Sequence, residues 1–186
     1  MKRAWMAALW MAGGCAHEGA GGPSWIEEPM AGIADPDGVV FAAVGRSDLG
    51  RADPALARAD AEADARSQVA TQLRAWVHRV VARTSEAMRD HETGALFGQT
   101  VVSDASQQMT EVVLVGSRPM QTHYSPNPEH PERVWVRLVV EVESRDVRAA
   151  IVSAGDREAR RRGMQLRHDE LIRHLEESLR VVQPHG

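Results

Sequence analysis

The most regular pattern of apolar and polar positions runs from residue 53 to residue 89 and has the period of an α-helix. Small or apolar side chains recur there at steps of three, four or seven residues. This stripe consists of Leu56, Ala59, Ala63, Ala70, Leu73, Val77, Val80, Thr84 and Met88. Asp53 and Pro54 form a strong start signal, because a carboxylate accepts hydrogen bonds from the first free N–H groups and proline fits the first turn. We therefore predict one helix of roughly 54 Å, at 1.5 Å per residue.

Three further stretches have the patterns of β-strands. Val39–Val44 contains no polar residue, which is typical of a strand covered on both faces or of a central strand. Residues 134–143 alternate between apolar and other side chains, the clearest period of two in the chain. Residues 118–125 alternate more weakly, and a proline-rich loop joins the two stretches. We predict that they form an antiparallel hairpin with one buried face, on which the long helix lies.

The segment between the first strand and the long helix stands where a phosphate-binding loop would be expected. Gly45 and Gly50 have the spacing of such a loop, but Arg51 replaces its lysine and Ala52 replaces its hydroxyl residue. Without a lysine for the phosphates or a hydroxyl for magnesium, the pattern argues against nucleotide binding. We predict a simple glycine turn from Gly45 to Asp53.

The remaining apolar patterns are helical. Residues 101–114 have mixed character and predict a short helix that ends near Gly116. From Ser144 a helical pattern resumes, interrupted by Gly155 and Gly163. A final helix carries Leu171, Ile172, Leu175, Leu179 and Val182, a stripe suited to packing on the domain, to loose projection or to a coiled-coil contact. The predicted fold class is α+β: a long amphipathic helix packed on a small antiparallel sheet, with an additional C-terminal helix.

The N-terminal pattern is that of a targeting segment. A short basic region, residues 1–3, precedes a nine-residue apolar run, residues 4–12, which is too short to span a bilayer and suits a signal peptide. The run leads through small residues to Cys15, the only cysteine in the chain. This resembles a bacterial lipobox, which implies cleavage before Cys15 and acylation of its thiol and new amine. The alternative is an ordinary secretory signal with an unrelated cysteine.

This pattern divides the chain into four parts. They are a signal peptide over 1–14, a lipidated flexible tether over 15–30, an α+β domain over 31–155 and a C-terminal helical extension over 156–186. Cleavage before Cys15 removes two of the 22 basic residues and none of the 26 acidic ones, so the net charge changes from −4 to −6. An acidic body argues against nucleic acid as a partner.

Several stretches together match one family pattern. They are Pro29, Phe41–Gly45, Ala59–Arg66 leading to Val69 and Leu73, and Val134–Val140. With the lipobox and the tether, their order resembles the twenty-kilodalton LPP lipoprotein family, of the Helicobacter surface-lipoprotein type. The resemblance covers roughly residues 25–150 and implies a long helix across an antiparallel sheet, related modules in envelope assemblies and no enzymatic activity. The residues after 150 and Ala12, where the family prefers leucine, depart from it.

Catalytic patterns are weak. Glu170 and His174 lie one helical turn apart and could chelate a metal, but His168 and His174 are six residues apart, whereas zinc motifs place two histidines four apart with a further ligand. No nucleophile elbow of the Gly-x-Ser-x-Gly type is present. An acylated Cys15 cannot act as a nucleophile. We therefore predict no enzymatic activity, no cofactor and no metal site.

The sequence predicts a lipid-anchored protein of the cell envelope that acts as a non-catalytic binding or scaffold module. Its expected partners are the bilayer, through acylated Cys15, and an envelope protein or a second copy, through the C-terminal helix. Ala16 after the cysteine resembles the outer-membrane choice in enteric bacteria. The alternative is a hydrolase or metal-dependent enzyme that uses His123, His168, His174 and acidic side chains, which would then converge in one concave pocket.

Overall fold

The computed structural model describes residues 22–33, 39–49, 53–88, 98–117, 119–125 and 133–182. Within these ranges the fold is α+β, as predicted, with four helices and a small antiparallel sheet. The elements in order are η1 (Ser24–Ile26), β1 (Val39–Asp48), α1 (Pro54–Ala87), α2 (Gln99–Gly116), β2 (Pro119–Ser125), β3 (Arg133–Val142), α3 (Ser144–Arg162) and α4 (His168–Val181). The signal segment, Cys15 and the loop after Ser125 lie outside the described residues.

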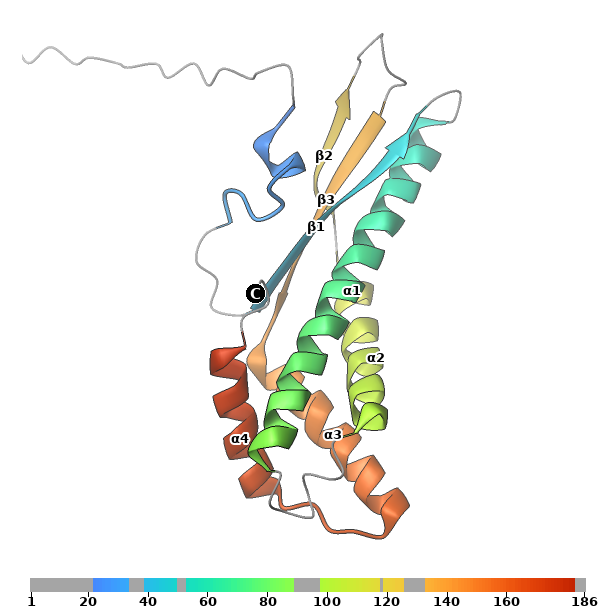
Figure 1. Cartoon of the computed structure of the whole chain (residues 1–186). Coiled ribbons are helices and arrows are strands. Elements are labelled where there is room, and N and C mark those ends of the chain that lie inside the picture. Colours follow the sequence, from blue (N-terminus) through green and yellow to red (C-terminus); the bar gives the residue numbers. More distant parts are fainter. Residues whose placement is uncertain are drawn as a thin grey trace, which may run out of the picture.

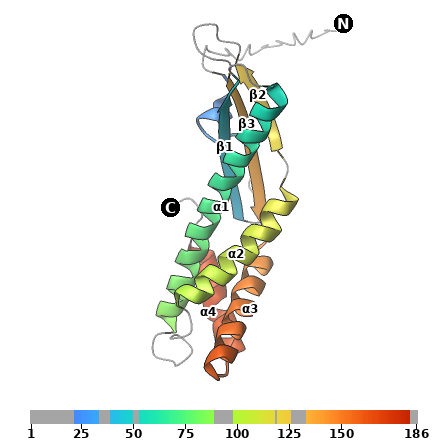
Figure 2. The same cartoon turned by 90° about the vertical axis from the view of Figure 1, so that its right-hand side faces the viewer.

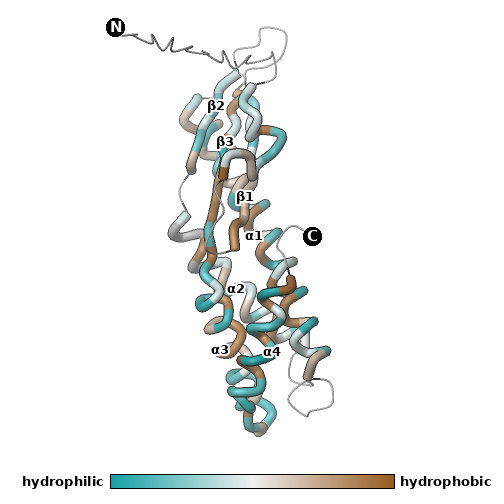
Figure 3. Tube along the Cα trace, turned by 90° about the vertical axis from the view of Figure 1, so that its left-hand side faces the viewer, coloured by the Kyte–Doolittle hydropathy of each residue, from teal (hydrophilic) through white to brown (hydrophobic). Residues whose placement is uncertain are grey.

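The body is elongated, with the sheet at one end and the helices at the other (Figures 1 and 2). Helix α1 runs along almost the whole length, so that its first half lies on the sheet and its second half lies among α2, α3 and α4. Along α3 and α4 hydrophilic and hydrophobic positions alternate around each helix (Figure 3). The long helix is therefore the element that joins the two halves of the molecule.

The sheet has the strand order β1-β3-β2, and both pairings are antiparallel. The predicted hairpin of β2 and β3 is confirmed. Strand β1 pairs with β3 from Val39 to Asp48, so it lies at an edge and β3 is central. The prediction that a turn begins at Gly45 is wrong, because β1 continues for three more residues beyond that glycine.

Gly45 has a packing role where α1 crosses β1. A Cβ atom at this position would overlap the carbonyl oxygen of Ala61 and the backbone nitrogen of Ala65. The helix backbone therefore lies directly on the strand, which only glycine permits at that point. This close approach also decides which face of α1 is buried.

The first three turns of α1 bury a different set of residues from the one predicted. Ala57, Ala61 and Ala65 are buried, whereas Leu56, predicted to be buried, is 57% exposed. Ala59 and Ala63 are also exposed. The alanines of this segment occur on several faces, so their spacing does not select one, and the contact with Gly45 does. From Leu73 onward the prediction holds, and the Asp53 cap is confirmed, since Asp53 Oδ1 accepts from the Ala55 N–H at 2.9 Å.

The helical end of the body is closed by α4. The indole Nε1 of Trp76, which is fully buried, donates to the carbonyl oxygen of Val182 at 2.9 Å. The hydroxyl oxygens of Thr84 and Ser178 lie 3.1 Å apart; because the Thr84 proton goes to the carbonyl oxygen of Val80, Ser178 is the donor of this pair. Leu175 is buried in the main core. Of the alternatives left open for the last helix, packing on the domain is the one observed.

The predicted boundary at residue 155 falls inside α3. Gly155 is buried within this helix and does not interrupt it. The helix ends at Gly163, which adopts a left-handed conformation with φ of 66°. Residues 156–182 are therefore continuous with the body and do not form a separate extension.

The face of the sheet opposite α1 is covered by residues 22–33, which we call the strap. Its short helix η1 buries Trp25, and Figure 1 shows it beside the sheet on the side away from α1. Arg137, on the central strand and 4% exposed, donates to the carbonyl oxygens of Pro29 at 2.8 Å and Ala31 at 2.7 Å. The strap thus belongs to the packed body, although residues 22–30 fall inside the segment predicted to be a flexible tether.

The outer edge of β1 is covered by side chains of α1. Gln72 and Gln68 donate from Nε2 to the carbonyl oxygens of Ala42 and Val44, at 3.1 and 3.2 Å. One turn earlier, Asp64 Oδ2 accepts from the backbone N–H of Arg46 at 3.1 Å. These three helix positions are four residues apart, so one stripe of α1 satisfies the backbone groups that an edge strand leaves free.

Candidate functional site

The histidines named in the sequence analysis lie on two elements, His123 on β2 and both His168 and His174 on α4. His123, on β2, packs on Trp135 with ring centroids 5.6 Å apart. His168, at the start of α4, has its Nε2 2.9 Å from Asp156 Oδ1. His174 lines a small cavity of about 310 Å³ with Arg83, Glu86, Ala87, Glu177 and Ser178. The structure does not bring the three histidines together, and in the described ranges no cluster of three or more His, Cys, Asp or Glu side chains could hold a metal.

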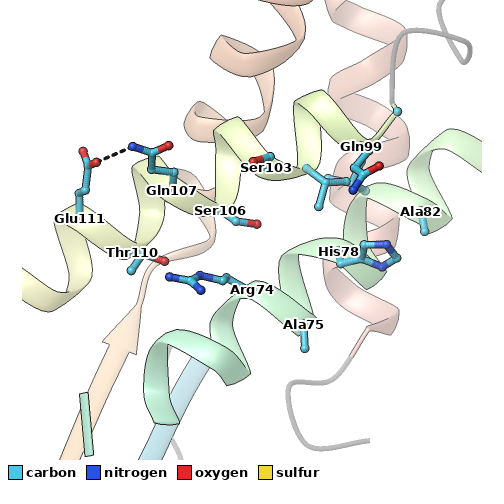
Figure 4. A pocket seen from close by; sticks show the side chains of 13 residues that line it. Arg74, Ala75, His78, Ala82, Gln99, Ser103, Ser106, Gln107, Thr110 and Glu111 are labelled. Atoms are coloured by element: carbon cyan, nitrogen blue, oxygen red, sulfur yellow. Dashed lines mark hydrogen bonds between the residues drawn. The ribbon is translucent and has the colours of Figure 1, made fainter. Parts of the chain in front are cut away.

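A larger hollow lies between α1 and α2 and is called the α1–α2 groove below (Figure 4). Its volume is about 1040 Å³. It is lined by Arg74, Ala75, His78, Val81 and Ala82 of α1 and by Gly98, Gln99, Val102, Ser103, Ser106, Gln107, Thr110 and Glu111 at and along α2. Small-molecule sites are concave, of roughly 300–1,000 Å³, and combine apolar walls with a few convergent polar groups. The groove has this size and this mixed lining.

Two residues of α2 that line the groove have buried hydroxyl groups without a partner in the described residues. Ser106 is 5% exposed, and neither its Oγ nor the Oγ1 of Thr110 has a hydrogen-bond partner among the described residues. By contrast, Thr84 and Thr71 of α1 donate to the carbonyl oxygens four residues earlier, both at 2.9 Å. A buried polar group without a partner costs free energy, and in native proteins it often marks a place that water or a ligand fills.

Arg74 is the cation of the groove. Its side chain extends from α1 toward Thr110, as Figure 4 shows. No ion pair to it is found within the described part of the chain. Glu111, the one carboxylate among the described lining residues, is already engaged, since its Oε1 accepts from Gln107 Nε2 at 3.0 Å. The guanidinium therefore remains available to an external acceptor.

Ion pairs on the far side of α2 fix that wall of the groove. Asp104 lies 3.5 Å from Arg157 and 3.4 Å from Arg161, both on α3. Glu158 pairs with Arg162 at 2.7 Å and with Arg161 at 3.1 Å. The hydrogen bond from Arg162, aided by Arg161, lowers the pKa of Glu158 below its ordinary value. Arg161 therefore pairs both with Asp104 of α2 and with Glu158 of its own helix, and together with Arg157 it holds α2 on α3.

Sequence reasoning missed the groove residues. Ser106 and Thr110 directly follow the buried residues Ala105 and Met109 on α2. The available sequence signal was therefore a pair of hydroxyl residues, four positions apart, next to an apolar stripe of the helix. Arg74 is one of many arginines, and nothing in its local sequence sets it apart. The groove depends on the crossing of α1 and α2, which the helical periods do not predict.

Comparisons of the chain with profiles of known protein families, with curated proteins and with solved structures gave no match. Among the described residues, no helix has both the length and the apolar character that a bilayer crossing requires. The resemblance to the LPP lipoprotein family stays a prediction.

Proposed function

We propose that the chain is a lipid-anchored envelope protein that acts as a binding module, with the α1–α2 groove as its ligand site. The observation that carries the binding function is the Ser106 hydroxyl, buried in the groove and without a partner in the described residues. A scaffold with purely structural helices would be more stable with an apolar residue at this position. The buried hydroxyl therefore supports a polar occupant of the groove, and the proposed occupant is a ligand.

The anchor is proposed from the sequence. Cys15 follows small residues at the end of a short apolar run, and acyl chains contribute about 0.8 kcal/mol per buried methylene to membrane binding. Two or more chains on Cys15 anchor the protein stably. We assign the anchored protein to the outer membrane, in line with Ala16 after the cysteine.

The strap changes the geometry of this anchor. Gly22, the first residue of the strap, follows Cys15 by seven residues, so a chain of at most about 3.6 Å per residue keeps the strap within roughly 25 Å of the lipidated cysteine. The anchor therefore keeps the strap near the bilayer surface. This position favours ligands or partners that lie within the envelope over distant ones.

The enzyme alternative requires convergence of histidines and acidic side chains. His123 and His168 each have neighbours of their own on separate elements, so no observation in the described residues favours that alternative.

Native mass spectrometry of the full chain purified from membranes tests the binding function. Ser103 and Gln108 are both exposed positions of α2, but only Ser103 lines the groove. The wild type and the control Gln108→Trp are expected to carry a ligand of discrete mass that Ser103→Trp, with its groove filled, has lost. The same mass in all three proteins would contradict the proposed site.

A further inference from the structure

The proposed function does not specify the chemical class of the ligand. The side chains at the Arg74 end of the groove indicate this class. Three side chains that can donate hydrogen bonds face this end: the guanidinium of Arg74 from α1 and the hydroxyls of Ser106 and Thr110 from α2 (Figure 4). Neither hydroxyl is engaged elsewhere in the described structure, and Arg74 has no ion pair there. The set therefore offers donors and a positive charge, and its natural complement is an anion.

We propose that the α1–α2 groove binds a small ligand through an anionic oxygen group, a carboxylate or a phosphate, held by Arg74, Ser106 and Thr110. The proposal deepens the binding function proposed above and depends on it. A guanidinium recognises both anions with paired N–H donors. Hydroxyls on one helix face, four residues apart, can donate to the same anion from the opposite wall.

The charges around the site agree with this assignment. Among the described lining residues Glu111 is the one carboxylate, and its side chain accepts a hydrogen bond from Gln107 on the side away from Arg74 (Figure 4). At the other end, Gly98 and Gln99 mark the N-terminus of α2, whose free N–H groups carry partial positive charge. His78 also lines that half. The described lining therefore favours a negative ligand group.

The remaining lining suits the rest of the ligand. Ala75, Val81, Ala82 and Val102 give apolar contact surface beyond the polar end. A volume of about 1040 Å³ holds far more than an inorganic ion, so the anion is one group of a larger molecule.

The test follows backbone amide and arginine side-chain signals of the full-length chain by NMR during titration with sodium phosphate and, separately, sodium acetate. Sodium chloride at the same ionic strength is the reference. Saturating shifts of the Arg74 Nε–H and of α2 amides near Ser106 are expected with at least one of the two anions. Whether the saturating shifts occur with phosphate, with acetate or with both identifies the class of anion that the groove binds. Shifts that sodium chloride reproduces would overturn the proposal.

Substitutions separate the site from general electrostatics. Arg74→Gln should weaken binding at least about 10-fold, because hydrogen bonds to charged groups are the stronger kind. Arg58→Gln on the same helix, where Arg58 is exposed and pairs with Glu62 at 3.1 Å, should leave the affinity unchanged. Equal affinity of Arg74→Gln and the wild type would contradict the assignment.

In Ser106→Ala, the melting temperature and the anion affinity should change in opposite directions, which a purely structural serine would not produce. Removing an unsatisfied buried hydroxyl should raise the melting temperature of the free protein and weaken anion binding by about 2- to 10-fold. A lower melting temperature would show that the hydroxyl is satisfied in the free protein, against the proposal.

These outcomes distinguish the ligand class from the binding function itself. If neither anion binds while wild type carries a ligand mass that Ser103→Trp lacks, the anionic class is wrong and the groove remains the binding site. If the wild type also carries no ligand mass, the proposed binding function is wrong as well.

Discussion

Arg137 and Pro29 are joined by a hydrogen bond across the sheet, from the guanidinium Nε to the proline carbonyl oxygen at 2.8 Å. The same guanidinium donates to Ala31 at 2.7 Å and to Gln121 Oε1 at 2.8 Å. Burial lowers the pKa of Arg137, and these three acceptors compensate for its desolvation. The contact therefore ties residues 29–31 of the strap to the central strand.

Arg137→Met should release the strap. Methionine fills similar space but donates nothing, so two backbone carbonyls lose their partner, and we expect the free energy of unfolding to fall by about 2–4 kcal/mol. Limited proteolysis should cut between residues 22 and 33 in this variant. The control is Arg133→Met on the same strand, whose exposed pair with Asp48 should contribute less than about 1 kcal/mol. Equal behaviour of the two variants would refute the role of Arg137.

Gly45→Ala should separate α1 from β1. The added methyl overlaps the backbone of Ala61 and Ala65, which cannot yield as a flexible side chain would. We expect a loss of about 3 kcal/mol in denaturant unfolding, at the upper end of overpacking effects. Gly98→Ala, whose Cβ would meet nothing within 4 Å, is the matched control. A loss no larger than that of the control would mean that the helix can move without cost.

The comparison of sequence and structure shows where periodicity is informative. Val77 and Val80 were placed correctly because bulky apolar residues on one helical face have few alternatives. Ala59 and Ala63 were placed wrongly because alanine is compatible with either face. The decisive contact, with Gly45, joins residues far apart in sequence, and the local pattern around the glycine is equally that of a turn.

The candidate site was harder to predict than the fold. Cys15 was singled out from its position alone, and its acylation stays a prediction. Ser106 and Arg74 acquire meaning only because two helices cross with their side chains facing one groove. What marks Ser106 is a missing partner, which is a property of three-dimensional packing and not of sequence.

Removal of the glutamine cover should expose the edge of β1. In the double variant Gln68→Ala, Gln72→Ala the carbonyls of Val44 and Ala42 lose their donors. We expect about 1–2 kcal/mol lower stability and new self-association through the free edge, seen by sedimentation. The double variant Gln107→Ala, Gln108→Ala on α2 should stay monodisperse to the same degree as wild type. Association in both double variants would point to a general loss of solubility.

Acid should weaken the ion pairs that Glu158 makes with Arg161 and Arg162 within α3. Because the pKa of Glu158 is lowered in the folded state, chiefly by the hydrogen bond from Arg162, its contribution is present above the unfolded pKa. That contribution disappears as the pH falls through the folded value. Glu158→Gln should therefore flatten the acid limb of a stability–pH curve below about 4.5, and Glu143→Gln, at an exposed position, should not. Parallel acid limbs for wild type and Glu158→Gln would contradict this role.

The central claim is that the body is tied to a bilayer through Cys15, and intact-mass spectrometry of the membrane-fraction protein tests it most directly. The account predicts a mature chain that starts at residue 15 and carries acyl chains, and it predicts that Cys15→Ala loses both the acyl mass and membrane association. An unacylated, freely soluble wild-type protein would contradict the anchor and remove the main support for the family resemblance.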